Sequence, residues 1–110
     1  MQAIESNDDF KTFVTNAKEA GKKTFIQCSA DWCNPCKTIA GDMAGFAETY
    51  KDKFAFGKVD ADELVFEDLM EMYEVTDLPA FIVLDGPGPA KASHTGSKVD
   101  SIKEFIENNQ

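Results

Sequence analysis

Residues 30–37 read Ala30-Asp31-Trp32-Cys33-Asn34-Pro35-Cys36-Lys37 and lie between a β-rich run and a segment with helical spacing. A Cys-x-x-Cys pair at a helix start places its first sulfur beside unpaired backbone N–H groups and the positive end of the helix dipole, which favour the thiolate. The second sulfur follows about one helical turn later, within reach of a disulfide. Pro35 suits the first turn because it has no N–H and its φ is already helical. We therefore expect Cys33 to be the open, nucleophilic thiol and Cys36 the buried, resolving thiol.

On both sides of this stretch, the spacing of apolar residues alternates between helix-like and strand-like. Expected strands cover residues 3–4, 24–29, 54–60, 80–84 and 90–94, and expected helices cover residues 8–20, 35–50, 65–73 and 98–106. We expect Asn7 to cap the first helix and Ser97, with Asp100 three residues later, to cap the last. The order β-α-β-α-β-α-β-β-α predicts an α/β fold, with a central mixed sheet flanked by helices and closed by an antiparallel hairpin.

The length of 110 residues and mass of 12.1 kDa predict one domain spanning residues 1–110. The net charge is −9, from 11 Lys, no Arg and 20 acidic residues, which argues against binding to nucleic acid or to an anionic membrane. Apolar runs are too short for a membrane span, and the N-terminus does not read as a signal peptide. Three cysteines, two of them close together, are not a secreted disulfide framework. We therefore expect a cytoplasmic, monomeric protein whose cysteines carry out chemistry.

Taken together, these features resemble the thioredoxin family. The motif Trp-Cys-x-Pro-Cys-Lys runs from Trp32 to Lys37 after an apolar strand, Leu78-Pro79 opens another apolar strand, and Gly96 follows. The resemblance covers essentially all of the chain and implies the thioredoxin fold. It also implies a dithiol–disulfide oxidoreductase that reduces protein disulfides and serves cell redox homeostasis. No bound cofactor or metal is implied, because the cysteines carry the electrons and a NADPH-dependent thioredoxin reductase restores the dithiol.

The same resemblance implies roles for residues outside the Cys-x-x-Cys pair. Trp32 would flank the reactive sulfur in the surface that docks client proteins, for which peroxiredoxin-type or reductase-type clients are plausible. Pro79 matches the family's cis-proline, so Leu78–Pro79 should be cis and Leu78 should offer its backbone to an extended client segment. Gly96 matches a loop glycine that lets the partner approach closely, and Lys58 matches a lysine beneath the active site.

Three positions depart from the family's pattern. Asn34 replaces the usual Gly before Pro35, and this dipeptide tunes the thiol pKa and the redox potential. Gln27 replaces a buried Asp that is credited with exchanging a proton with the resolving Cys, which an amide cannot do. Gly41 replaces a proline that kinks the helix, so we expect any bend to come from glycine flexibility.

Less specific interpretations exist for several of these residues. Cys33 and Cys36 could form half of a zinc site with Cys28 and His94, although the ligand spacing is poor for a structural site. Cys28 by itself reads as an inert, buried thiol, and His94 as a solvated side chain on an edge strand. Lys58 could equally be a solvated lysine.

Two alternative functions also stay open. One is an oxidant or isomerase-type domain in which Asn34 raises the redox potential, and the other is a binding module that lost turnover together with its buried Asp.

Acidic residues with helical spacing read most simply as a solvated helix face; these are Asp62, Glu63, Glu67, Asp68, Glu71 and Glu74.

Overall fold

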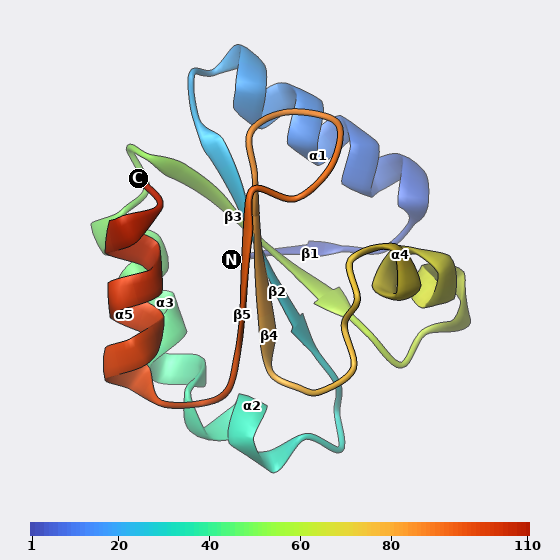
Figure 1. Ribbon diagram of the computed structural model, residues 1–110, viewed down its shortest axis with the longest axis vertical. Helices are drawn as coiled ribbons and strands as arrows, with labels where there is room; N and C mark the ends of the chain where they lie inside the picture. Colours follow the sequence, from blue (N-terminus) through green and yellow to red (C-terminus); the bar gives the residue numbers. More distant parts are fainter.

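The computed structural model describes residues 1–110 and contains one five-stranded mixed sheet (Figure 1). The strands follow the spatial order β1-β3-β2-β4-β5, in which β1, β3 and β2 are parallel while β4 and β5 are antiparallel to their neighbours. Their bounds are Gln2–Ile4 (β1), Lys23–Ser29 (β2), Phe54–Asp60 (β3), Ala80–Leu84 (β4) and Ala92–Thr95 (β5). The predicted order of strands and helices is confirmed.

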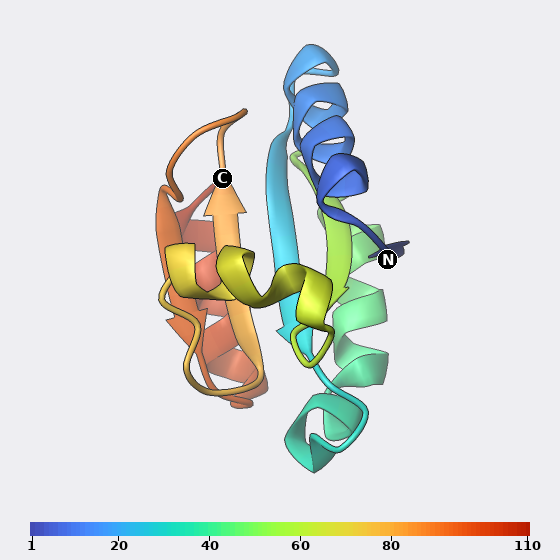
Figure 2. The same ribbon diagram turned by 90° about the vertical axis from the view of Figure 1, so that its right-hand side faces the viewer.

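Helices cover both faces of this sheet. They are α1 (Asn7–Glu19), α2 (Asn34–Thr38), α3 (Ala40–Thr49), α4 (Glu67–Met72) and α5 (Val99–Asn108), with a 3-10 turn, η1 (Leu64–Phe66), before α4. Figure 1 shows α3 and α5 on one face and α1 and α4 on the other, and Figure 2 views the sheet from the side of α1 and α4. No helix has the length and apolar character needed to span a membrane.

Strand β2 lies in the middle of the sheet and divides the core between the two faces. Phe25 packs with apolar side chains of α3 and α5, whereas Ile26, the next residue, packs with those of α1 and α4. This alternation follows from the two-residue period of a strand. Aromatic rings crowd the first face, where the Phe25 ring lies 5.0 to 6.1 Å, between centroids, from the rings of Phe54, Phe56, Phe81 and Phe105.

The expected helix over residues 35–50 is two helices, which corrects the prediction. The chain turns at Ile39, with φ −93° and ψ 1°, so that this residue ends α2 and precedes α3. Ile39 is 1% exposed and lies in the core cluster on the α3 and α5 face. The turn therefore occurs where a side chain is buried against the sheet, two residues before Gly41, and the expectation of a glycine bend is wrong.

Both predicted capping residues are also wrong. Ser6, not Asn7, caps α1, because the Ser6 hydroxyl accepts a hydrogen bond from the Asp9 N–H at 3.0 Å. The Asn7 amide instead donates to the Val65 carbonyl at 2.6 Å, a contact across 58 residues of sequence. The last helix starts after Lys98 without any side-chain cap, so Ser97 does not cap it.

Candidate active site

The two cysteines of the Cys-x-x-Cys motif lie at the start of α2 and form a disulfide, with 5.3 Å between their Cα atoms. Cys33 is the N-cap residue, and its Sγ accepts a hydrogen bond from the Cys36 N–H at 3.2 Å. Pro35 lies in the first turn, as predicted. The Cys33 sulfur is therefore placed where a helix start stabilises negative charge.

Cys36 is buried, as expected, but Cys33 is buried too, so the expectation of an open Cys33 is wrong and exposure does not distinguish the two cysteines. Cys33 is 3% exposed and Cys36 is 5% exposed in the disulfide form. Both pack in a small cluster with Ala30, and the half-buried Leu78 lies against it. Leu78 belongs to a loop about 45 residues after Cys33 in sequence, so the Cys-x-x-Cys motif alone did not indicate that this side chain packs on the cysteines.

Among the predicted docking residues, Leu78 lies against the two cysteines and is followed directly by Pro79. The Leu78–Pro79 peptide bond is cis, as predicted. The Pro79 carbonyl accepts a hydrogen bond from the Gly96 N–H at 3.0 Å, which holds the Gly96 loop against the Pro79 loop. Gly96 has φ +123°, a conformation that a side chain would disfavour. Trp32, the only tryptophan, is 65% exposed next to Cys33, as expected.

Behind Cys36 lies a pocket of about 280 Å³ that Gln27 and Lys58 also line. These two residues are register partners on the parallel strands β2 and β3, and Gln27 is 4% exposed whereas Lys58 is exposed. The departure at position 27 therefore lies in the same pocket as Cys36, and an amide occupies that position. A second departure from the family's pattern, Asn34, lies between the two cysteines and is exposed on α2.

Three charged residues that our sequence-based site did not include line the same pocket: Asp31, Lys37 and Asp60. Asp60 follows Lys58 by two positions on β3, and the two-residue period of a strand could have indicated that both face the same side. One Asp60 carboxylate oxygen accepts a hydrogen bond from the Asp62 N–H at 2.9 Å, which orients the carboxylate at the end of the strand.

Cys28 and His94 lie apart from this site and on opposite faces of the sheet. Cys28 is fully buried in the cluster under α1 and α4, and burial raises the pKa of its thiol to about 12. His94 is half-buried and stacks on the rings of Phe81 and Phe105, at 6.2 and 5.4 Å, so the expectation of a solvated histidine is wrong. No group of three or more His, Cys, Asp or Glu side chains is placed to hold a metal ion, and the zinc alternative therefore lacks a ligand cluster.

Comparison with known proteins decides the family. The model of the thioredoxin family matches residues 2–108. The chain belongs to the thioredoxin family. It is 36% identical over 105 residues to a thioredoxin H-type of Oryza sativa subsp. indica, which covers 94% of this chain and 82% of the rice protein.

Two further thioredoxin-family relatives bear on the fold and the activity. The crystal structure of the germline-specific thioredoxin Deadhead from Drosophila melanogaster superposes with a TM-score of 0.85 at 26% identity, covering 98% of each chain. The protein disulfide-isomerase 1 of Dictyostelium discoideum is 30% identical over 96% of this chain, which spans 29% of that longer protein. With its Cys33–Cys36 pair, this thioredoxin-family chain is a dithiol–disulfide oxidoreductase and acts as a protein-disulfide reductase.

Proposed function

We propose that Cys33 is the nucleophile and Cys36 the resolving thiol of this reductase. The observation that carries the assignment is the position of Cys33 at the N-cap of α2, with the Cys36 N–H donating to its sulfur. This N–H and the positive end of the helix dipole stabilise the Cys33 thiolate more than the Cys36 thiolate, because Cys36 lies within the first helical turn.

The exchange then proceeds in two balanced steps. The Cys33 thiolate attacks one sulfur of a client disulfide, which forms a mixed disulfide and releases the other client sulfur as a thiolate. Cys36, after losing its proton, attacks the Cys33 sulfur, so that the Cys33–Cys36 disulfide forms and the second client sulfur leaves. Two electrons pass from the protein to the client, and the client thiolates take up protons from the surroundings.

Four residues form the client-docking surface in this proposal. The Leu78 backbone pairs with an extended client segment, and Pro79 holds the loop that faces the disulfide. Trp32 provides exposed aromatic surface beside Cys33, and Gly96 leaves room for the client backbone. The hydrogen bond from the Gly96 N–H to the Pro79 carbonyl supports this arrangement, because it holds the two loops next to each other.

Four other residues modulate the reaction. Asn34 and Pro35, between the cysteines, set the redox potential through the geometry and polarity around the Cys33 sulfur. Gln27 and Lys58 act on the proton of Cys36 through the pocket that they share with it. Because Gln27 cannot accept a proton, water in that pocket or the charge of Lys58 has to assist the resolving step.

We further propose that a thioredoxin reductase restores the dithiol with electrons from NADPH, and that the chain works as a monomeric electron carrier in the cytoplasm. No cofactor has to bind the chain for this cycle. Membership of the thioredoxin family supports the partner, and the cysteine usage supports a reducing compartment. Peroxiredoxin-type and reductase-type proteins are the proposed clients.

The test is reduction of insulin disulfides by the chain in the presence of NADPH and a thioredoxin reductase. We expect NADPH consumption that depends on the chain and is abolished by Cys33→Ser. If the chemically reduced chain reduces insulin but NADPH is not consumed, the proposed recycling is wrong while the reductase activity stands.

The protein disulfide-isomerase relative favours one second candidate, an oxidant or isomerase role. The redox potential, measured by equilibration with glutathione, separates the two. We expect a redox potential of about −270 mV for a thioredoxin-type reductase and of about −180 mV for an isomerase-type domain.

A further inference from the structure

The pocket behind Cys36, with a volume of about 280 Å³, contains groups that can accept a proton. The charged groups of the residues that line it are the carboxylates of Asp31 and Asp60, the ammonium groups of Lys37 and Lys58, and the α-amino group of Met1. Of these, only a carboxylate is both charged and an acceptor. The pocket therefore places the resolving thiol of the proposed mechanism in the same space as two candidate proton acceptors.

Asp60 is the better placed of these two carboxylates. It is the last residue of β3 and is half-buried, whereas Asp31 is exposed. The Asp62 N–H donates to one Asp60 carboxylate oxygen at 2.9 Å, and the Ala61 N–H donates to the Ser29 carbonyl at 2.8 Å. These two hydrogen bonds hold the end of β3 and orient its carboxylate, and the second carboxylate oxygen is left free to accept.

The polar lining of the pocket comes from matching positions on two parallel strands. Gln27 and Ser29 of β2 are the register partners of Lys58 and Asp60 of β3, and all four line the pocket together with Cys36. Gln27 is 4% exposed and Ser29 is 8% exposed. A polar pocket with room for several water molecules is one that water occupies.

The resolving step has one proton to place. A thiol keeps its proton near neutral pH, so Cys36 has to lose it before or during its attack on Cys33. The Gln27 amide cannot take up a proton, and the Lys58 ammonium can only donate. A carboxylate is the one acceptor that the lining of the pocket offers besides water.

We propose that Asp60 takes up the proton of Cys36 through water in this pocket. The proposal rests on the proposed role of Cys36 as the resolving thiol and adds a residue to that step. The Gln27 amide and the Ser29 hydroxyl hydrogen-bond to the water and so orient it.

Protons and electrons balance in this step. The Cys36 thiol gives its proton to a water molecule, which gives one to the Asp60 carboxylate, while the Cys36 sulfur attacks the Cys33 sulfur of the mixed disulfide. The Cys33–Cys36 bond forms, and the client sulfur leaves as a thiolate with the electron pair of the broken bond. Asp60, being half-buried, then releases its proton to the solvent.

An acceptor and a mere negative charge would change the rate in opposite directions. An acceptor at Asp60 accelerates the loss of the Cys36 proton, whereas a negative charge close to a thiol disfavours its thiolate and slows the step. Asp60→Asn keeps the size of the side chain and an oxygen that can accept from the Asp62 N–H. This substitution therefore removes the acceptor with little change in shape.

The first experiment separates the two exchange steps with an excess of a nitrobenzoate disulfide, whose released thiolate is coloured. In stopped-flow reactions of the pre-reduced chain, attack by Cys33 releases one thiolate at a rate that depends on reagent concentration. Attack by Cys36 releases the second at a rate that does not. We expect Asp60→Asn to slow the second phase about tenfold near pH 7 and to leave the first phase within about twofold. The second phases should converge toward about pH 9, where free thiolate becomes abundant.

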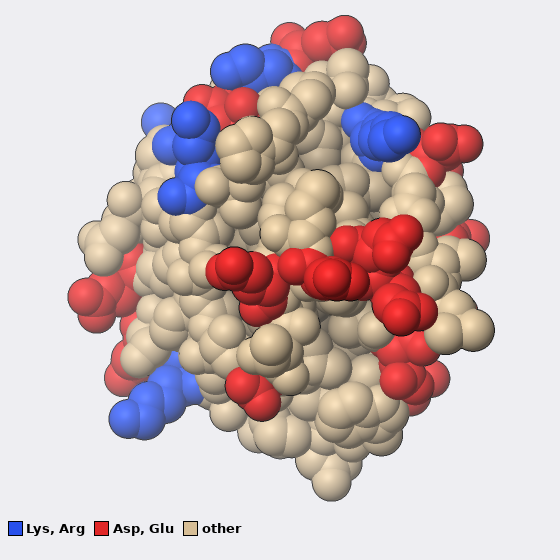
Figure 3. Space-filling view, turned by 45° about the vertical axis from the view of Figure 1, so that its right-hand side comes forward, with Lys and Arg blue, Asp and Glu red and all other residues tan.

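Two other carboxylates serve as controls. Acidic side chains are numerous, and Figure 3 shows them as a band across the side that carries α4, so an effect of total charge has to be distinguished. Asp62→Asn removes the same charge two residues away, from an exposed side chain outside the pocket lining, and should leave the second phase unchanged. Asp31→Asn removes the other carboxylate of the pocket and should have a smaller effect than Asp60→Asn.

The second experiment repeats the Asp60 substitution in a chain that carries Gln27→Asp. A carboxylate at position 27 gives Cys36 another acceptor in the same pocket, so Asp60→Asn should lose most of its effect in that chain. An effect of equal size in both chains would show that Asp60 does not act on the proton, and it would overturn the proposal.

The remaining outcomes separate this inference from the function on which it rests. An unchanged or faster second phase in Asp60→Asn overturns the proposal and leaves Cys36 as the resolving thiol. Equal slowing by Asp62→Asn, a larger effect of Asp31→Asn, or equal slowing of both phases at every pH also overturns it. Release of only one thiolate by the unmodified chain would reject the proposed role of Cys36 itself.

Discussion

The two active-site sulfurs differ in their backbone surroundings and not in their exposure. The Cys33 sulfur lies at the N-cap of α2 and accepts a hydrogen bond from the Cys36 N–H, whereas Cys36 lies inside the helix. Both residues are buried in the disulfide form. The electrostatic environment of the helix start therefore has to separate their reactivities.

We expect Cys33→Ser to abolish turnover and Cys36→Ser to accumulate mixed disulfides with clients, because the second exchange step is then missing. In the reduced chain at neutral pH, iodoacetamide should label Cys33 first. Cys28 is the internal control: with its pKa raised to about 12 by burial, it should react only after unfolding. Mass spectrometry of the labelled peptides measures the order, and faster labelling of Cys36 or Cys28 than of Cys33 would contradict the assignment.

Position 27 provides a second test at the scale of one residue. In the proposed mechanism Cys36 has to lose a proton before it attacks Cys33, and Gln27, which lines the same pocket as Cys36, has no group that could accept this proton. Gln27→Asp should accelerate resolution of the mixed disulfide near neutral pH by about tenfold or more, because a positioned carboxylate acts as a general base. Stopped-flow reduction of a protein disulfide between about pH 6 and pH 9 measures this step.

The matched control for this test is Gln27→Asn, which has the size of Asp but no carboxylate. Both substitutions shorten a side chain that is 4% exposed, so both should lower stability, but only Asp should change the pH profile. Superimposable profiles for Gln27→Asp and the unmodified chain would mean that position 27 lies outside the proton path.

At the scale of the elements, two glycines differ in the space around them. Gly45, inside α3, has open space around the position of a Cβ atom. Gly57, inside β3, has none, because a Cβ atom would lie 2.8 Å from Ile4 Cδ1, 3.1 Å from Phe13 Cε1 and 3.2 Å from Ile26 Cδ1. Gly57 is therefore required by the packing of β1 and α1 against β3.

We expect Gly45→Ala to raise the free energy of unfolding by about 0.5–1 kcal/mol, since alanine loses less conformational freedom in a helix. Gly57→Ala should lower it by about 1–3 kcal/mol, because three apolar side chains have to shift. Urea titrations of the two variants beside the unmodified chain measure both changes. A neutral Gly57→Ala would show that the ends of the isoleucine side chains move aside freely.

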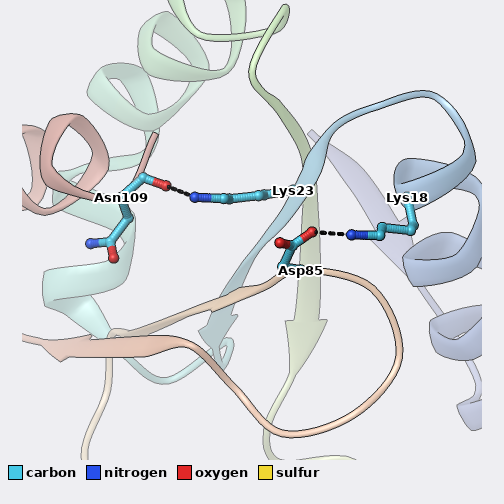
Figure 4. Close-up of polar contacts among 4 residues, drawn as sticks. All are labelled: Lys18, Lys23, Asp85 and Asn109. Atoms are coloured by element: carbon cyan, nitrogen blue, oxygen red, sulfur yellow. Dashed lines mark hydrogen bonds and ion pairs between the residues drawn. The ribbon is translucent and has the colours of Figure 1, made fainter.

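At the scale of the whole molecule, polar contacts join parts of the chain that are far apart in sequence (Figure 4). The Lys18 ammonium of α1 lies 2.8 Å from a carboxylate oxygen of Asp85, in the loop after β4. The Lys23 ammonium donates to the Asn109 carbonyl at 2.9 Å and so joins β2 to the end of α5. The hydrogen bond and the charge of Lys18 hold the pKa of Asp85 below its usual value.

This lowered pKa predicts a pH dependence of stability with a defined sign. Asp85 binds its proton less tightly in the folded state than in the unfolded state, so it stabilises the fold above the unfolded pKa of 3.8. That contribution is lost as the pH falls below this value through the folded pKa. Asp85→Asn should lower stability slightly at neutral pH and converge with the unmodified chain in acid. Lys18→Met should give the same loss, and a difference that persists at low pH would contradict this account.

The amino-acid sequence alone determined the order of the elements and the centre of the site. The change between two-residue and helical spacing of apolar residues is a local property, and it located the strands and helices around Cys33 and Cys36. The Cys-x-x-Cys pair with Pro35 is likewise contained in four consecutive residues. These features follow from contacts between near neighbours in the chain, which is why the sequence contains them. The cis bond at Leu78–Pro79, in contrast, was expected only from the resemblance to the thioredoxin family.

Tertiary structure decided the features that depend on residues distant in sequence. Leu78 packs against Cys33, the chain turns at the buried Ile39 within the expected helix, and the rings of Phe81 and Phe105 stack on His94. Such neighbours are set by how the helices pack on the sheet, and a linear pattern does not contain that information.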